Sequence, residues 1–128
     1  MPLTHCTILL VEDESLVRTV VSDVLKDTGY AVIEAVDGQA GYEVLISGAQ
    51  IDLLISDIRM PGRMDGHELA RAALSIRPTL PMLLMTGCEN EELAEAVWSM
   101  GVRIVHKPFT FNQLLALAQC MLEAPKSA

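Results

Sequence analysis

The most informative stretch of the sequence surrounds Asp57, a carboxylate that directly follows a run of apolar residues. The run is Leu-Leu-Ile at positions 53–55, followed by Ser56, and a Met-Pro-Gly turn begins at Met60. A short, uninterrupted apolar run is typical of a strand buried on both faces of a parallel sheet. Because ligands of open α/β sheets bind beyond the carboxyl ends of the strands, Asp57 is expected at the edge that carries the chemistry. Taken alone, however, Asp57 is better explained as a cap of the following turn.

Four other polar residues favour a functional site, because they also stand at the ends of apolar runs. Glu12 and Asp13 follow one run, Thr86 closes another, and Lys107 comes just after a third. The runs are residues 7–11, 82–85 and 103–105. The carboxyl ends of parallel strands share one edge of a sheet, so these side chains are predicted to meet Asp57 there. Each has an ordinary structural explanation by itself, but their joint placement at one edge makes those explanations unlikely together.

These residue types predict phosphoryl chemistry on a carboxylate. Carboxylates held close together repel each other unless a cation neutralises them. Asp13 and Asp57, with Glu12 behind, offer the hard oxygen ligands that suit Mg²⁺, an ion that keeps several waters and accepts few carboxylates. Lys107 adds a compact positive charge and Thr86 a hydroxyl donor, and both suit a dianionic phosphoryl group. An aspartyl phosphate is an established covalent intermediate, so Asp57 is the candidate nucleophile.

The rest of the chain supplies the elements that would position this site. Strand-like and helix-like patterns alternate five times, and no internal repeat or linker interrupts them. Strands are predicted at residues 7–11, 31–36, 53–56, 82–85 and 103–105, and helices at 16–25, 38–45, 65–76, 89–100 and 110–122. This alternation predicts one doubly wound α/β domain, a parallel sheet covered by helices on both faces with right-handed crossovers. The domain is assigned to residues 1–128, with a core from about residue 6 to residue 123.

Local signals mark several helix ends. Asp37 is a predicted N-cap, and Thr110 and Gln113 have the spacing of a capping box. Gly29 is expected to stop the first helix. The apolar stripe predicted to face the sheet from that helix is Leu16, Val17, Val20, Val21, Val24 and Leu25. In the third helix the residues predicted to point inward are Leu69, Ala72, Ala73 and Ile76.

Composition excludes several classes of partner. The net charge is -8, so direct binding to nucleic acid or to an anionic membrane surface is not expected. No apolar run approaches the roughly 20 residues that a membrane span needs. The cysteines number three, are widely spaced and form no CxxC pair. They are expected to be free thiols, which favours a cytoplasmic location.

Taken together, the motifs resemble those of a response regulator receiver domain of bacterial two-component signalling. The matching segments are Ile8–Glu14, Asp57–Pro61 with Met64–Gly66, Met85–Gly87 and Lys107–Phe109. They stand in the order of that family, near its spacing, and extend over nearly the whole chain. The resemblance implies a flavodoxin-like strand order of 2-1-3-4-5 and a chemotaxis-regulator-like domain.

The resemblance also implies roles for the metal-binding residues. Asp57 is expected to be the phosphoacceptor. Asp13 and Asp57, with the backbone carbonyl of Arg59, are expected to hold Mg²⁺, and Glu12 to assist through water. This arrangement agrees with the preference of Mg²⁺ for a few protein oxygens together with water and phosphate.

The resemblance also implies roles for Thr86, Lys107 and Ile104, which are expected to respond to phosphorylation. By resemblance, Thr86 and Lys107 contact the phosphoryl group, and the Lys107–Pro108 peptide is expected to be cis, which is plausible because the partner is proline. Ile104 stands where the family often has an aromatic residue that swings inward on activation. A β-branched aliphatic side chain has restricted rotamers and no hydroxyl, so a smaller or differently located conformational change is expected here.

Two other departures from the family pattern concern the loops at this edge. The turn from Met60 to Gly66 carries one extra residue and is therefore expected to be longer and looser. In the family, the positions two after the phosphoacceptor and two after the threonine influence how fast the phosphoryl group is lost. Here they are Arg59 and Cys88, and neither is a carboxylate or an amide that could orient an attacking water.

The predicted function is therefore a signalling switch that takes a phosphoryl group from a sensor histidine kinase or a histidine phosphotransfer protein. It would assist its own phosphorylation and dephosphorylation, with no turnover of an external substrate. A downstream protein or a second copy of the chain is expected on the face formed by residues 89–100, 103–105 and 110–122. One alternative is an aspartate-dependent phosphohydrolase, although Arg59 stands where such enzymes usually carry a second Asp. Another is a phosphate-independent interaction module. The sequence leaves open the cognate kinase, the pathway, the oligomeric state, the dephosphorylation rate, and whether the chain acts alone or within a hybrid kinase.

Overall fold

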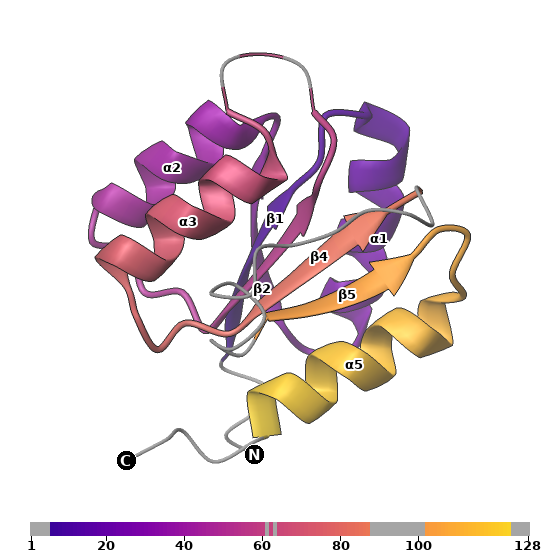
Figure 1. Cartoon of the computed structure of the whole chain (residues 1–128). Coiled ribbons are helices and arrows are strands. Elements are labelled where there is room, and N and C mark those ends of the chain that lie inside the picture. The colour runs from indigo at the N-terminus through magenta and orange to yellow at the C-terminus, as the bar shows by residue number, and fades with distance from the viewer. Residues whose placement is uncertain (1–5, 61, 63, 88–101, 124–128) are drawn as a thin grey trace.

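The computed structural model describes residues 6–60, 62, 64–87 and 102–123, which form alternating strands and helices (Figure 1). The strands are β1 (Thr7–Val11), β2 (Ala31–Ala35), β3 (Leu53–Asp57), β4 (Met82–Thr86) and β5 (Val102–His106). The helices are α1 (Ser15–Asp27), α2 (Gly38–Ile46), α3 (Gly66–Ile76) and α5 (Phe111–Glu123). The helix predicted at residues 89–100 lies outside the described residues. Every described element lies within two residues of its predicted bounds.

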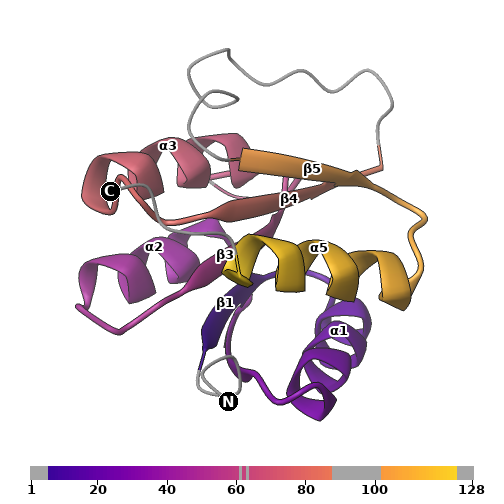
Figure 2. The ribbon, with the colours of Figure 1, turned by 90° about the horizontal axis from the view of Figure 1, so that it is seen from below.

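The strands form one parallel sheet in the order β2-β1-β3-β4-β5, as predicted. Figure 2 shows α2 and α3 on one face of the sheet and α1 and α5 on the other. Parallel strands need a crossover between them, and helical crossovers cover both faces of the sheet and bury its central strands β3 and β4. The prediction of a doubly wound, flavodoxin-like α/β domain is therefore confirmed.

The core has two halves, one on each side of the sheet. Successive side chains of a strand point to opposite faces. In β1, Leu9 and Val11 therefore pack toward α2 and α3, whereas Ile8 and Leu10 pack toward α1 and α5. All residues of β3 and β4 are buried, which explains why the sequence shows unbroken apolar runs there.

Predicted caps fix the starts of two helices. The side chain of Asp37 accepts a hydrogen bond of 2.8 Å from the amide of Ala40 at the start of α2. Before α5, Thr110 and Gln113 form a reciprocal capping box, with hydrogen bonds of 3.0 and 2.8 Å. A second capping box, between Asp65 and Glu68, starts α3. Such caps satisfy amide groups that the first turn of a helix leaves without a partner.

The predicted apolar stripe of α1 is wrong at two positions. Leu16 is 75% exposed and Val20 is 38% exposed, whereas Val21 and Leu25 are buried against the sheet. A helix turns by about 100° per residue. Val20 therefore points well away from the direction of its buried neighbour Val21. In α3, Ile76 is likewise 38% exposed because it is the last residue of the helix. Gly29 follows the end of α1 with a φ of 111°, as expected for a helix stop.

None of the described helices has the length and apolarity that a membrane span requires. Cys120 is an exposed free thiol. The third cysteine, Cys88, lies outside the described residues.

Candidate functional site

The polar residues predicted to meet at one edge of the sheet do so. Asp57 is the last residue of the central strand β3, and Thr86 is the last residue of its neighbour β4. Glu12 and Asp13 follow β1 on the other side of β3, and Lys107 follows β5. Parallel pairing in register brings all four strand ends to the same level of the sheet. The topology therefore assembles the site from segments that are far apart in the sequence.

Three carboxylates form the acidic part of the site. Glu12, Asp13 and Asp57 each offer one oxygen, and these oxygens lie within 4.8 Å of one another. Glu12 is fully buried, Asp57 is 6% exposed, and Asp13 is half-buried. Negative charges this close and this poorly hydrated repel one another strongly, so the arrangement calls for a positive charge.

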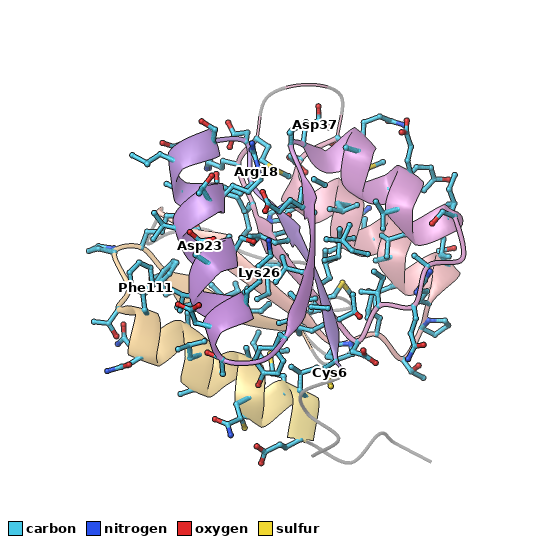
Figure 3. All side chains as sticks on the ribbon, turned by 180° about the vertical axis from the view of Figure 1, so that it is seen from behind. Cys6, Arg18, Asp23, Lys26, Asp37 and Phe111 are labelled. Carbon is cyan, nitrogen blue, oxygen red and sulfur yellow. The ribbon has the colours of Figure 1, made fainter. Side chains whose placement is uncertain are left out.

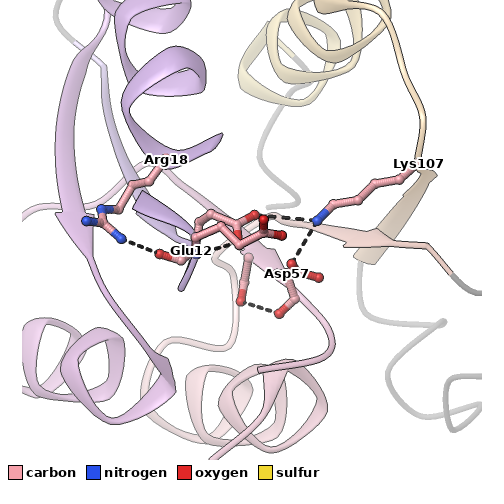
Figure 4. Close-up of polar contacts among 6 residues, drawn as sticks. Glu12, Arg18, Asp57 and Lys107 are labelled. Atoms are coloured by element: carbon pink, nitrogen blue, oxygen red, sulfur yellow. Dashed lines mark hydrogen bonds and ion pairs between the residues drawn. The ribbon is translucent and has the colours of Figure 1, made fainter. Parts of the chain in front are cut away.

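Lys107 supplies one positive charge. Its Nζ donates a hydrogen bond of 2.8 Å to Oδ2 of Asp57 and lies 3.5 Å from Oε1 of Glu12 (Figure 4). The backbone amide of Lys107 donates a hydrogen bond to the carbonyl of Thr86, which holds the start of the β5–α5 loop against β4. Burial alone would lower the pKa of Lys107, but the hydrogen bond and charge of Asp57, together with Glu12, raise it above its ordinary value. The lysine is therefore charged at neutral pH.

Glu12 is the most perturbed carboxylate of the site. Its pKa is raised from 4.5 to about 7, mainly by burial and to a smaller extent by the charge of Asp57, against the lowering effects of the Glu14 amide and Lys107. Its Oε2 accepts a hydrogen bond of 3.1 Å from the amide of Glu14. Its buried Oε1 has no hydrogen-bond partner in the described part of the chain, although it lies 3.5 Å from Nζ of Lys107 as an ion pair.

The donor set fits a small, hard cation. It combines three neighbouring carboxylates with a buried oxygen of Glu12 whose hydrogen-bonding capacity is unused. Buried polar oxygens are normally hydrogen-bonded, so one without a hydrogen-bond partner beside two further carboxylates suits a second positive charge in addition to Lys107. The residues present can therefore hold a metal ion.

The other predicted site residues lie around this cluster. Thr86 is buried, with 1% of its surface exposed, and Arg59 is exposed two residues beyond Asp57. Ile104 of β5 is partly buried and packs against the half of the core under α2 and α3. The Lys107–Pro108 peptide is cis. The structure therefore brings Thr86 and Lys107 to the edge of the sheet that carries the carboxylates, whereas Ile104 packs against the core.

The loop between β3 and α3 is held at both ends. The amide of Gly66 donates a hydrogen bond of 2.7 Å to the carbonyl of Ile58. Gly66 packs so closely on the strand end that a Cβ there would overlap the carbonyl oxygen of Asp57. Met60, at the other end of the loop, is buried. The prediction that the loop from Met60 to Gly66 is longer and looser includes residues 61 and 63, which lie outside the described residues.

Two features of the site were not predicted from the sequence. Gly66 was identified only as a helix start, and its close approach to Asp57 depends on how α3 packs on the sheet. Arg18 was not singled out, although its Nη1 donates a hydrogen bond of 2.7 Å to the backbone carbonyl of Glu12. The spacing of Arg18 within α1 gives no local signal for that contact, since an exposed surface arginine would have the same spacing.

The fold and the site together define a class of protein. A parallel sheet of order 2-1-3-4-5, with an acidic cluster and a lysine around a central strand-end aspartate, is the architecture of a signalling receiver. The family model of the response regulator receiver domain matches residues 8–119. The chain therefore belongs to the response regulator receiver domain family, a component of two-component regulatory systems.

Comparison with individual proteins agrees with this assignment. The chain is 33% identical over 119 residues to the sensor kinase CckA of Brucella abortus (strain 2308), an alignment that covers 91% of this chain and 12% of the kinase. It is 30% identical over 122 residues to the transcriptional regulatory protein FixJ of Bradyrhizobium diazoefficiens, covering 94% of this chain and 58% of FixJ. The chain thus spans less than two thirds of either relative.

A solved structure shows the same fold over nearly the full length. The crystal structure of a response regulator receiver protein from Sinorhizobium medicae WSM419 superimposes with a TM-score of 0.80 at 34% sequence identity. The match covers 94% of this chain and 96% of that one. These curated relatives are a sensor kinase and a transcriptional regulator rather than phosphohydrolases.

Proposed function

We propose that this receiver domain accepts a phosphoryl group on Asp57 from a phosphohistidine of a sensor histidine kinase or a histidine phosphotransfer protein. A carboxylate oxygen of Asp57 forms the bond to phosphorus while the bond from phosphorus to the histidine nitrogen breaks. The observation that carries the proposal is the position of Asp57, hydrogen-bonded to Lys107 at 2.8 Å and adjacent to two further carboxylates. This environment suits a carboxylate that becomes a phosphorylated dianion.

Each neighbouring residue has a proposed role in that transfer. Asp13, Asp57 and the carbonyl of Arg59 bind Mg²⁺, and Glu12 holds a water of the ion. The ion supplies positive charge for the transferring oxygens. Lys107 neutralises the phosphoryl group from the side of β5, where its raised pKa keeps it charged. The hydroxyl of Thr86 donates to a phosphoryl oxygen, and this contact reports the phosphorylated state.

The proposed output runs through β5 and α5. Movement of Thr86 toward the phosphoryl group changes the space beside Ile104, which packs in the core below. Arg103 and His106 of β5 are exposed. We infer that a downstream protein or a second copy of the chain binds a face that includes β5 and α5 and responds to this change. Residues 89–100, which are also predicted to belong to this face, lie outside the described residues.

The phosphodonor is proposed to dock beside the site on the apolar surface of α1 and α5. Both helices start at the edge of the sheet that carries Asp57, and they lie next to each other (Figure 3). Leu16 near the start of α1 is 75% exposed, and Phe111 at the start of α5 is 44% exposed. Exposed large apolar side chains next to a reactive group suit a partner that must bring its own reactive group into contact. Cys120 is an exposed free thiol, which suits the reducing cytoplasm, where we place this encounter.

The alternatives receive less support. A phosphohydrolase would need a general acid two residues after the nucleophile, and Arg59 cannot serve in that role. A phosphate-independent module would not need three carboxylates gathered around a lysine, an arrangement that is costly unless it binds something.

The receiver domain is assigned to the whole chain, with a core from about residue 6 to residue 123.

The test is mass spectrometry after incubation with acetyl phosphate, with and without Mg²⁺. Wild-type protein should gain the mass of one phosphoryl group only when Mg²⁺ is present, and the adduct should map to Asp57. Asp57→Asn should remain unmodified, because an amide does not attack phosphorus. Asp52→Asn is the matched control, since Asp52 lies at the opposite end of β3 and accepts a hydrogen bond from the amide of Thr7. Labelling of Asp57→Asn at the wild-type level would refute the assignment.

A further inference from the structure

Arg18 links the acidic loop of the site to the edge strand of the sheet. It lies on α1, and its side chain is only 15% exposed. At one end, Nη1 donates a hydrogen bond of 2.7 Å to the backbone carbonyl of Glu12 (Figure 4). In the other direction, Nε lies 3.4 Å from Oε1 of Glu34 on β2. A guanidinium has several donors in a rigid planar fork, so one group can hold both partners at once.

The carbonyl that Arg18 holds belongs to the peptide between Glu12 and Asp13. That peptide is planar, so fixing its oxygen also fixes the amide of Asp13 and the direction in which the chain continues. The preceding peptide is already fixed, because the amide of Glu12 donates a hydrogen bond of 3.1 Å to the carbonyl of Ala35. Arg18 therefore supplies the second restraint on the residue pair that contributes two of the three carboxylates.

We propose that Arg18 is a positioning residue for the cation site: it orients the Glu12–Asp13 peptide so that both carboxylates point toward Asp57. The role in cation binding rests on the function proposed above, whereas the restraint on the loop exists in the metal-free protein as well. Groups that orient ligands without touching the metal commonly change its affinity by ten- to a hundredfold. Glu34 sets the orientation of the guanidinium from the other side.

Lys26 provides a matched control on the same helix. Its Nζ lies 3.8 Å from Oε2 of Glu34, so Lys26 has the same ion-pair partner and the same positive charge as Arg18. Figure 3 labels both residues on α1. Its side chain is 52% exposed, and its only ion pair in the described residues is with Glu34. Replacing Lys26 thus removes one positive charge and one contact to Glu34 without touching the peptide between Glu12 and Asp13. A difference between the two variants isolates the contact with the loop.

The experiment compares Arg18→Met with Lys26→Met in two measurements. In the first, amide NMR spectra of the metal-free proteins should show large shifts and faster hydrogen exchange at Asp13 and Glu14 in Arg18→Met, and wild-type values in Lys26→Met. The amide of Glu14 is a direct reporter because it donates to the side chain of Glu12. In the second, calorimetry should show Mg²⁺ affinity at least about tenfold weaker in Arg18→Met and within about twofold of wild type in Lys26→Met.

Two outcomes would overturn the proposal. The first is that the amides of Asp13 and Glu14 keep wild-type shifts and exchange rates in metal-free Arg18→Met. The second is an equal loss of Mg²⁺ affinity in both variants, which would indicate a general effect of charge. If Arg18→Met does not fold, Arg18→Lys is measured instead and should show smaller losses in the same direction, because one ammonium cannot span both partners. Absence of Mg²⁺ binding in the wild type would refute the proposed function, while the metal-free spectra would still decide the restraint by Arg18.

Discussion

Buried Glu12 should make the metal-free protein less stable as the pH rises through the weakly acidic range. Burial raises its pKa from 4.5 to about 7. Between those values the folded protein binds a proton that the unfolded chain releases, so the free energy of unfolding falls as the pH increases. One pKa unit corresponds to about 1.4 kcal/mol, so Glu12 should cost the fold roughly 3 kcal/mol between about pH 4 and pH 8. Below the lower value and above the higher one, its contribution should be constant.

The isosteric change Glu12→Gln tests this magnitude. Glutamine keeps an oxygen that can accept the hydrogen bond from the amide of Glu14 but cannot ionise. Urea unfolding in the presence of a chelator gives the free energy of unfolding at each pH. Relative to wild type, Glu12→Gln should become more stable as the pH rises, by roughly 3 kcal/mol over the range.

The control is Glu43→Gln, which removes a carboxylate from the exposed surface of α2 and should follow the wild-type pH dependence. Adding Mg²⁺ to wild type should reduce the destabilisation, because a bound cation favours ionised Glu12. Parallel wild-type and Glu12→Gln curves over the whole range would show that burial does not perturb this carboxylate, and the electrostatic reasoning would be wrong.

Three further predictions concern other parts of the site. Asp13→Ala should weaken Mg²⁺ binding by at least about tenfold in calorimetry, since it removes one of the three carboxylates, and an unchanged affinity would exclude Asp13 as a ligand. Gly66→Ala should lower the free energy of unfolding by about 1–3 kcal/mol, because its Cβ would overlap the carbonyl oxygen of Asp57. Gly87→Ala, whose Cβ would meet no atom within 4 Å, should change stability far less, and equal losses in the two glycine variants would contradict the packing argument. Amide NMR with a phosphoryl mimic should show only small changes along β5 and α5; large changes that disappear in Ile104→Ala would show that Ile104 performs the role of the aromatic residue found in other receivers.

The sequence by itself determined the architecture and which side chains gather at the edge of the sheet. β3 and β4 are buried on both faces, so they appear as unbroken apolar runs that are recognisable without coordinates. Alternation of such runs with amphipathic segments admits few topologies, and parallel strands end at a common edge. Asp57 and Lys107, 50 positions apart, could therefore be assigned to one site before any distance was known, and the structure joins them at 2.8 Å.

Tertiary structure decided which side chains are buried and what each one contacts. The apolar pattern of α1 includes both Leu16, which is exposed, and Val21, which is buried, so the pattern alone does not decide which of them faces the sheet. The face that packs depends on the angle at which the helix meets the sheet, and that angle depends on packing against other elements. The contact of Arg18 with the carbonyl of Glu12 has the same origin, since a hydrogen bond from a side chain to a loop leaves no periodic signal in the sequence. Residue type and spacing specify which groups reach the edge of the sheet, and packing across the elements specifies their burial, their pKa values and their orientation.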